Sequence, residues 1–244
     1  MQPNPIERKQ TMSNLKTWVA AAAIVTLSGA AQAALVNRGG GMIYDTTRNI
    51  TWLADMNYAR TSGYATANAG GAGANVIQLN GRMGWDAATT WADNLVYGGF
   101  SDWRLPTLNP ADASCTGGFG VGRGYNCTGG ELSGLFVTDL GYNNNGSGLI
   151  TSDDTAEQIA NLALFSNVQS HDYWSGTGYA TNPDFAWSFL TGGGFQDDDF
   201  KGSALYAVAV RPGDVAASVP EPQTLALALL ALGATVVARR RRPA

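Results

Sequence analysis

Two short apolar segments, one near each end of the chain, limit what the residues between them can fold into. The first follows Lys16, runs from Trp18 to Leu27 and ends at Ala31-Gln32-Ala33. This order of charged, apolar and small residues is typical of a secretory signal peptide, and it predicts cleavage after Ala33. About ten apolar residues are too few to cross the roughly 30 Å of hydrocarbon in a membrane. We therefore assign residues 1–33 to a signal peptide. This range includes a possible extension upstream of the signal itself.

The second apolar segment runs from Thr224 to Ala238 and is followed by Arg239, Arg240, Arg241 and Arg242. Arginines at the end of an apolar helix stay on the cytoplasmic side of a membrane. A run of 15 residues is shorter than the roughly 17 to 25 usual for a span, so this helix is a marginal anchor. Directly before it stands Val219-Pro220-Glu221-Pro222, where two prolines forbid a helix and leave the backbone extended.

A Pro-Glu-Pro motif, an apolar helix and an arginine cluster in this order resemble the PEP-CTERM sorting signal of Gram-negative bacteria. The resemblance implies recognition by an exosortase-type transpeptidase, a transient stay in the inner membrane, removal of the tail, and delivery to the cell surface or the exopolysaccharide matrix. It divides the C-terminal region into a linker with the motif (214–222), a transmembrane sorting helix (223–238) and a basic cytoplasmic tail (239–244). A GPI signal follows the same logic, since its apolar tail is absent from the mature protein.

The composition of residues 34–219 describes an acidic domain of ordinary size. This region has 8 Lys or Arg residues against 17 Asp or Glu residues, a net charge of −9, whereas the whole chain has a net charge of −4. Nucleic acid is not an expected partner, because proteins that bind it carry basic surfaces. The whole chain has 31 glycines and 7 tryptophans but only 14% charged residues, which favours a loop-rich exported fold over a disordered chain.

The two cysteines of the chain, Cys115 and Cys127, both lie in this region. In an oxidising compartment such an even number predicts a disulfide. A structural zinc site needs four ligands, and two cysteines with one histidine do not supply them. The bridge would pin a glycine-rich insertion, residues 117–130, and would add about 3 kcal/mol to stability by restricting the unfolded chain.

Hydrophobic periodicity predicts an α+β domain. A hairpin, a small-residue loop, two amphipathic helices and three later strands are expected in that order. Helices that come first and antiparallel strands that come last are typical of this class. The expected ranges are 42–45 and 50–53 for the hairpin, 65–75 for the loop, 84–96 and 131–140 for the helices, and 172–175, 185–190 and 205–211 for the strands.

The segment Asp102-Trp103-Arg104-Leu105-Pro106-Thr107 is the most specific part of a set of aromatic and polar residues in this region. This set resembles the Lcl family, also called DUF1566, over residues 34–213. The resemblance implies a loop-rich, C-type-lectin-like domain with two helices beside a twisted antiparallel sheet. In the family a Glu-Leu helix follows the Leu-Pro-Thr step within a few residues, whereas here residues 108–130 intervene before Glu131. The other residues that carry the resemblance are Gly41 to Asp45, Trp52, Trp91, Tyr173, Trp174, Ser175, Trp187 and Tyr206 to Arg211.

The middle of that specific segment also has a simple physical interpretation. Trp103 and Leu105 alternate onto one face of a strand, and Arg104 points the other way. Arg104 is expected to pair with a carboxylate such as Asp102 or Asp86. We therefore interpret Arg104 as a residue that holds the domain together rather than one that binds a ligand.

Catalytic chemistry is not predicted. His171 is the only histidine, so any Ser-His-Asp or Cys-His mechanism would depend on it, and the sequence has no nucleophile-elbow motif. A lone histidine beside Asp172, ahead of a strand, is more often structural or solvated. Carboxylates adjacent in sequence, as in Asp153-Asp154 and residues 197–199, seldom face each other across a substrate.

A binding role is the better alternative to a purely structural one. Lectin-like folds hold Ca²⁺ through carboxylate and amide oxygens of a long loop, since the ion takes about 6 to 8 oxygen ligands. The candidate ligands are Asn182, Asp184, Asp197, Asp198 and Asp199, although the acidic run 197–199 also suits a solvated turn. Two functions stay open. One is a surface or matrix protein that binds exopolysaccharide or another surface ligand, with or without Ca²⁺, and the other is a passive structural module whose partners are proteins.

Overall fold

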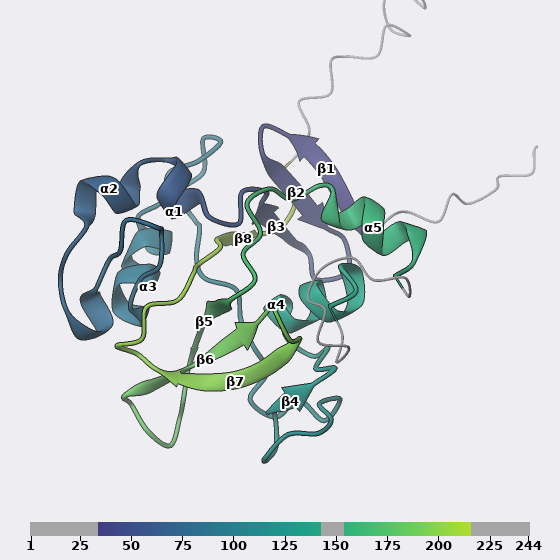
Figure 1. Cartoon of the computed structure of the whole chain (residues 1–244). Coiled ribbons are helices and arrows are strands. Elements are labelled where there is room, and N and C mark those ends of the chain that lie inside the picture. Colours follow the sequence, from purple (N-terminus) through teal and green to yellow (C-terminus); the bar gives the residue numbers. More distant parts are fainter. Residues whose placement is uncertain (1–33, 143–153, 216–244) are drawn as a thin grey trace, which may run out of the picture. The chain divides into compact units, whose positions relative to one another are not determined.

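The computed structural model describes residues 34–142 and 154–215 (Figure 1). The predicted signal peptide (1–33), the sorting motif (219–222) with its helix and basic tail, and Asp153 lie outside the described residues. No helix of the described part has the length and the apolar character that a membrane span requires. The described residues all belong to the region between the two apolar segments.

The first sheet joins the beginning of the domain to its end. Strands β1 (Leu35–Gly39), β2 (Met42–Asp45), β3 (Ile50–Leu53) and β8 (Val210–Pro212) pair antiparallel in that order. The predicted hairpin of β2 and β3 is confirmed. Its turn is stabilised because one carboxylate oxygen of Asp45 accepts hydrogen bonds from the backbone N–H groups of Thr47 and Arg48. The hydroxyl of Thr51 donates to the carbonyl oxygen of Gly213, 162 residues further along the chain.

The second sheet comes from the later part of the chain. Strands β4 (Gly124–Tyr125), β7 (Phe195–Phe200), β6 (Phe185–Leu190) and β5 (Asp172–Gly178) pair antiparallel in that order. β6 is confirmed as predicted, and β5 begins as predicted but is longer. The interpretation of residues 197–199 as a solvated turn is wrong, because they form the middle of β7. Their carboxylates are accommodated in a strand because Arg123 and Ser188 donate hydrogen bonds to them.

The two predicted helices are confirmed, with different boundaries. The first is α3 (Trp85–Asp93), and the second is one turn of α-helix, α4 (Glu131–Gly134), that continues as the π-helix η2 (Leu135–Asp139). The expected loop 65–75 is wrong in part, because it contains most of α2 (Tyr64–Asn68) and the 3₁₀ turn η1 (Gly73–Asn75). Alanine-rich segments form helical turns readily, since alanine loses no side-chain entropy. The short helices α1 (Tyr58–Thr61) and α5 (Ala156–Leu162) were not predicted.

The core has two halves, and an extended segment runs between them. The odd-numbered residues of 205–210 are buried with α1 and α3, and the even-numbered ones are buried with η2 and the first sheet. The predicted strand 205–211 is therefore extended, but only its end enters a ladder, in β8. The earlier part makes single bridges, from Leu205 to Met83 and from Tyr206 to Tyr173. Burial on both sides explains why this segment is apolar at consecutive positions.

Helices α1, α2 and α3 gather on one side of the domain, and strands β1 to β3 with α5 lie on the other (Figure 1). Helices combined with two antiparallel sheets make an α+β domain, as predicted. The strands are divided into two sheets of four, however, where one twisted sheet was expected. The division places β4, which belongs to the insertion between Thr107 and Glu131, at the edge of the second sheet.

Candidate functional site

Most residues that carry the Lcl resemblance lie in the core. Trp103 and Trp174 pack with α1 and α3, whereas Tyr173 and Trp187 pack against η2. Ser175 is fully buried, and its hydroxyl donates a hydrogen bond to the carbonyl oxygen of Trp187. Side chains that are buried to this degree stabilise the scaffold and do not contact a ligand directly.

Arg104 makes structural contacts, but both of its predicted partners are wrong. Its two terminal nitrogens each lie 2.7 Å from an oxygen of Glu131, and one of them also donates to the carbonyl oxygen of Leu105 at 3.0 Å. Glu131 accepts a further hydrogen bond from the backbone N–H of Thr107, at 2.8 Å. Burial acts to raise the pKa of Glu131, but the hydrogen bonds from Arg104 and Thr107 outweigh it and lower that pKa. Sequence reasoning considered only carboxylates close to Arg104 in the chain or on α3.

Asp102, one of the predicted partners, pairs instead with Arg211 of β8. The guanidinium lies 2.8 and 3.0 Å from the two carboxylate oxygens and stands 4.0 Å from the ring centroid of Phe100. Hydrogen bonding to Arg211 lowers the pKa of Asp102. Asp86, the other predicted partner, makes no ion pair within the described residues. The pair with Arg211 ties the last strand to the segment that precedes Trp103.

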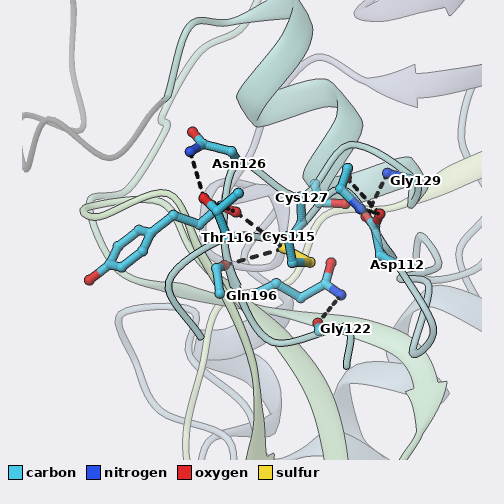
Figure 2. The surroundings of a disulfide bond; sticks show 12 residues. Asp112, Cys115, Thr116, Gly122, Asn126, Cys127, Gly129 and Gln196 are labelled. Atoms are coloured by element: carbon cyan, nitrogen blue, oxygen red, sulfur yellow. Dashed lines mark hydrogen bonds between the residues drawn. A yellow bond between two sulfur atoms is a disulfide. The ribbon is translucent and has the colours of Figure 1, made fainter. Parts of the chain in front are cut away.

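Residues 108–130 form an excursion that we call the disulfide loop. Its two ends meet, because Thr107 and Glu131 are hydrogen-bonded to each other. Cys115 and Cys127 are joined by a disulfide, as predicted (Figure 2). The chain thus leaves the scaffold after Thr107, forms a cross-linked hairpin and returns to the same point at Glu131.

Polar contacts complete the inside of the disulfide loop. Thr116 and Tyr125 exchange two backbone hydrogen bonds of 2.8 Å beside the disulfide. Asp112 accepts hydrogen bonds from the N–H and the hydroxyl of Ser114 and from the N–H of Gly129 (Figure 2). Burial acts to raise the pKa of Asp112, but these hydrogen bonds outweigh it and lower that pKa. The charged form of Asp112 therefore holds the two arms of the loop together.

Strand β4 docks the disulfide loop on the second sheet. The buried Gln196 of β7 donates from its amide nitrogen to the carbonyl oxygens of Asn109 and Gly122, at 3.0 and 2.6 Å (Figure 2). The arms of the loop approach closely, since a Cβ atom on Gly118 would lie 1.8 Å from the carbonyl oxygen of Arg123. Only glycine fits at that position, which accounts for part of the glycine-rich composition.

The side chain of Arg123 adds a second anchor between the loop and the sheet. Its guanidinium stands over the rings of Tyr179 and Trp187, 5.0 and 5.5 Å from their centroids. It also binds Asp197 at 2.9 Å and contacts Asp198 through two of its nitrogens. Burial raises the pKa of Asp197, although the pairing with Arg123 acts in the opposite direction. One cation thus connects the loop with β6 and β7.

Two apolar side chains at the turn of the disulfide loop are exposed to solvent. Phe119 is 93% exposed and Val121 is 72% exposed, and we call this pair the loop tip. The loop behind the tip is held by the disulfide, by Gln196 and by Arg123, so a ligand that contacts the tip meets a preorganised surface. Sequence reasoning missed both Arg123 and the loop tip. The available signal was a pair of apolar residues alternating with glycines between the two cysteines.

The five candidate calcium ligands are spread over a turn and a strand. The three in residues 197–199 are engaged by Arg123 and by the hydroxyl of Ser188, which donates to Asp199 at 2.6 Å. Between β5 and β6, the side-chain oxygen of Asn182 accepts a hydrogen bond from the N–H of Asp184. To bind calcium, the carboxylates of β7 would have to break their present hydrogen bonds. Calcium binding by these five residues stays a prediction.

Within residues 34–142 and 154–215, one group of three acidic, histidine or cysteine side chains has its ligand atoms within 4.8 Å of one another. It consists of Asp112, Cys115 and Cys127. Both sulfur atoms are in the disulfide, so neither is a thiolate that binds metal. This group is a structural feature of the loop.

His171 lies between a cation and a carboxylate. A guanidinium nitrogen of Arg82 is 3.2 Å from Nε2, and a carboxylate oxygen of Asp172 is 3.4 Å from Nδ1. Burial raises the pKa of Asp172, the charge of Asp199 adds to this effect, and His171 opposes it. These contacts do not indicate a catalytic role for His171. The absence of enzymatic activity stays a prediction.

Comparison with known proteins identifies the C-terminal segment. Residues 218–242 match the model of the PEP-CTERM protein-sorting motif, which confirms that part of the sequence analysis. No curated protein and no solved structure matches the chain. The Lcl resemblance of residues 34–213 finds no support in these comparisons.

The sorting motif defines the class to which the chain belongs, that of exported proteins that an exosortase delivers to the cell surface. The structure describes the α+β domain that precedes this motif, with its two sheets. Its most exposed apolar side chain, Phe119, lies on a loop closed by the one disulfide of the described residues.

Proposed function

We propose that this protein acts at the cell surface or in the exopolysaccharide matrix of a Gram-negative bacterium, where its domain binds a glycan or another surface ligand through the loop tip. The observation that carries the proposal is the exposure of Phe119 and Val121 on a loop that is cross-linked and docked on a sheet. Exposed apolar side chains on a rigid loop are typical of a contact surface. The proposal includes no catalytic activity.

The chemistry of the loop tip favours a neutral sugar polymer. The ring of Phe119 offers a flat apolar face that suits the C–H face of a pyranose ring. Between the two side chains, a Cβ atom on Gly120 would meet no atom closer than 3.9 Å, so the backbone there is accessible to sugar hydroxyls. A net charge of −9 for residues 34–219 repels a strongly anionic polymer. A neutral or weakly charged exopolysaccharide is therefore the preferred ligand class.

The finer assignment of residues 34–213 to an Lcl domain with a C-type-lectin-like fold is part of this proposal. It is supported by the burial of Trp103, Trp174 and Trp187. It is also supported by the pair of Arg104 and Glu131, because this pair brings the Leu-Pro-Thr step to the start of the Glu-Leu helix despite the insertion. The disulfide loop then takes the place of a short connection and adds a binding surface to the scaffold.

Processing belongs to the same proposal. We expect cleavage after Ala33, a transient stage in the inner membrane through the helix at residues 223–238, and removal of the basic tail by the exosortase. The motif match over residues 218–242 supports recognition by the sorting enzyme.

A glycan array probed with the exported, processed protein, with and without Ca²⁺, tests the binding function. We expect binding to neutral polysaccharide fragments that Phe119→Ser and Val121→Ser each weaken about fivefold or more, because truncating a contact residue at a binding surface costs about 1 kcal/mol or more. Val96→Ser is the matched control, since Val96 is also 72% exposed but lies after α3.

Binding that survives both loop-tip substitutions would place the ligand elsewhere on the domain. An array without any binding would contradict the proposal and would favour the passive structural module with protein partners. A requirement for Ca²⁺ would support the calcium-assisted version, whereas binding in chelator would exclude it.

A further inference from the structure

A pocket of about 390 Å³, lined mostly by residues with polar side chains, lies where the domain begins. Its walls include Ala34 before β1, Arg48 in the turn between β2 and β3, Asp139 at the end of η2, and Glu157 in α5. The π-helical turn is part of this geometry, because Asp139 is its last residue and reaches Arg48. Neither the sorting motif nor the loop tip gives this pocket a role.

The charges around the pocket are unequal. Arg48 bridges Asp45 and Asp139, with N–O distances of 2.6 and 2.5 Å. Glu157 also lines the pocket and adds a third carboxylate near this single guanidinium group. Burial raises the pKa of Asp139, the pairing with Arg48 opposes this, and the negative charges of Asp45 and Glu157 add to it. A second cation in the pocket would offset the excess negative charge.

Ala34 is held in place at this pocket by its own backbone. Its carbonyl oxygen accepts hydrogen bonds from the N–H and the hydroxyl of Thr46, at 2.8 and 3.2 Å. The next residue, Leu35, is 3% exposed and is paired with Asp45 across β1 and β2. Only the Cα atom separates the nitrogen of Ala34 from this fixed carbonyl group. Because Ala34 lines the pocket, its nitrogen stays near the pocket when the residues before it are removed.

We propose that removal of the signal peptide completes this pocket, because the new α-ammonium group of Ala34 forms an ion pair with Asp139 and Glu157. In the precursor the same nitrogen belongs to an uncharged amide. Hydrolysis of the bond between residues 33 and 34 adds OH to the carbonyl carbon of residue 33 and H to the nitrogen of Ala34, and the amine then takes up a proton from water. The exported domain is consequently more stable after cleavage than before it. The inference rests on cleavage after Ala33, which belongs to the proposed function.

The test measures how tightly the amine of the exported, processed protein holds its proton. N-terminal sequencing first establishes whether the chain begins at Ala34. Reductive methylation with ¹³C-formaldehyde keeps the positive charge and labels both the α-amine and Lys201, the only lysine between residues 34 and 219, which serves as internal reference. A pH titration followed by ¹³C NMR should show that the α-amine has a proton affinity about tenfold higher in the folded protein than in urea. Such an increase is typical for an amine beside carboxylates.

Substitutions then identify the carboxylates. Glu157→Gln should remove part of the increase and is expected to fold, because Glu157 is exposed. Asp139→Asn should remove a larger part of the increase in proton affinity. It also removes one of the two carboxylates that pair with Arg48 and leaves only Asp45. Asp93→Asn is the matched control, since Asp93 is exposed on α3 and is not part of the pocket wall. Acetylation of the α-amine, which abolishes its charge, should lower the melting temperature of the wild type and not that of a protein carrying both pocket substitutions.

Equal proton affinity in the folded and unfolded protein, without any response to Glu157→Gln, would overturn the ion pair even if processing occurs after Ala33. A first residue other than Ala34 would overturn the cleavage prediction and the ion pair with it. Neither result would affect glycan binding by the loop tip, which the array measures separately.

Discussion

Replacing Arg104 with alanine should destabilise the domain without altering the loop tip. The substitution removes two hydrogen bonds of 2.7 Å to Glu131 and one of 3.0 Å to the carbonyl oxygen of Leu105. Removing one partner of a fully buried ion pair costs about 3 to 5 kcal/mol, and an exposed pair contributes about 0 to 1 kcal/mol. The side chains of Arg104 and Glu131 are 35% and 17% exposed, so this pair lies between those limits. We expect a loss of about 2 kcal/mol.

For a domain of this size, such a loss lowers the melting temperature by about 4 to 8 °C, which calorimetry detects readily. Glu131→Gln and the double variant complete a thermodynamic cycle, in which we expect a coupling energy of about 1 kcal/mol. Arg60→Ala is the matched control, because Arg60 is exposed on α1 and should change stability by less than about 0.5 kcal/mol.

The effect should also depend on pH in a defined direction. The pKa of Glu131 is lowered in the folded protein, so the pair stabilises the domain above the ordinary glutamate pKa and loses this effect as the pH falls through the lowered value. The stability difference between the wild type and Arg104→Ala should therefore shrink below about pH 4. An unchanged melting temperature, or a coupling energy of zero, would refute this reasoning. Unchanged stability with abolished ligand binding would place Arg104 in the binding site.

Mass spectrometry of the envelope fraction should find a mature protein that begins at Ala34 and lacks residues 239–242, and an intact arginine cluster would count against cleavage by a sorting enzyme. The exported protein should contain no titratable thiol, and Cys115→Ser should make the disulfide loop the first site of limited proteolysis, with a loss of up to about 3 kcal/mol. Two free thiols in the native protein would show that idea to be mistaken. If Ca²⁺ takes part in ligand binding, calorimetry should show saturable binding of about one ion per domain that Asp184→Asn or Asp198→Asn abolishes. Titrations without a binding signal, together with a melting temperature that Ca²⁺ does not change, would show that calcium has no role in ligand binding.

Sequence reasoning predicted the features that depend on local patterns. The β2–β3 hairpin, α3 and the disulfide each follow from residues close together in the chain. Helix α5 also has a local signal, because Thr155 and Gln158 exchange hydrogen bonds of 3.1 and 2.9 Å in a capping box. A threonine followed three residues later by glutamine is a recognised start of a helix, and the sequence analysis assigned no element to this region.

Features that depend on distant partners were not predictable in the same way. Residues 197–199 have low strand propensity and lie within β7, where Arg123 donates to Asp197, 74 residues further along the chain, and to Asp198, and Ser188 donates to Asp199. The partner of Arg104 was missed for the same reason, since Glu131 lies beyond an insertion whose two ends meet only in the folded protein. The loop tip is defined by exposure, and exposure follows from the docking of β4 on β7.

The position of β8 sets an order of events during translocation. Residues 205–215 complete both halves of the core, so a chain that crosses the membrane from its N-terminus keeps apolar surface uncovered until nearly the whole domain has emerged. The second apolar segment begins at Thr224, nine residues after Val215. On the proposed route through the inner membrane, this segment would reach the membrane as the last strand becomes free to pair with β3. Completion of the fold and arrival of the sorting signal would then coincide in time, and a chain arrested earlier would expose its interior to proteases.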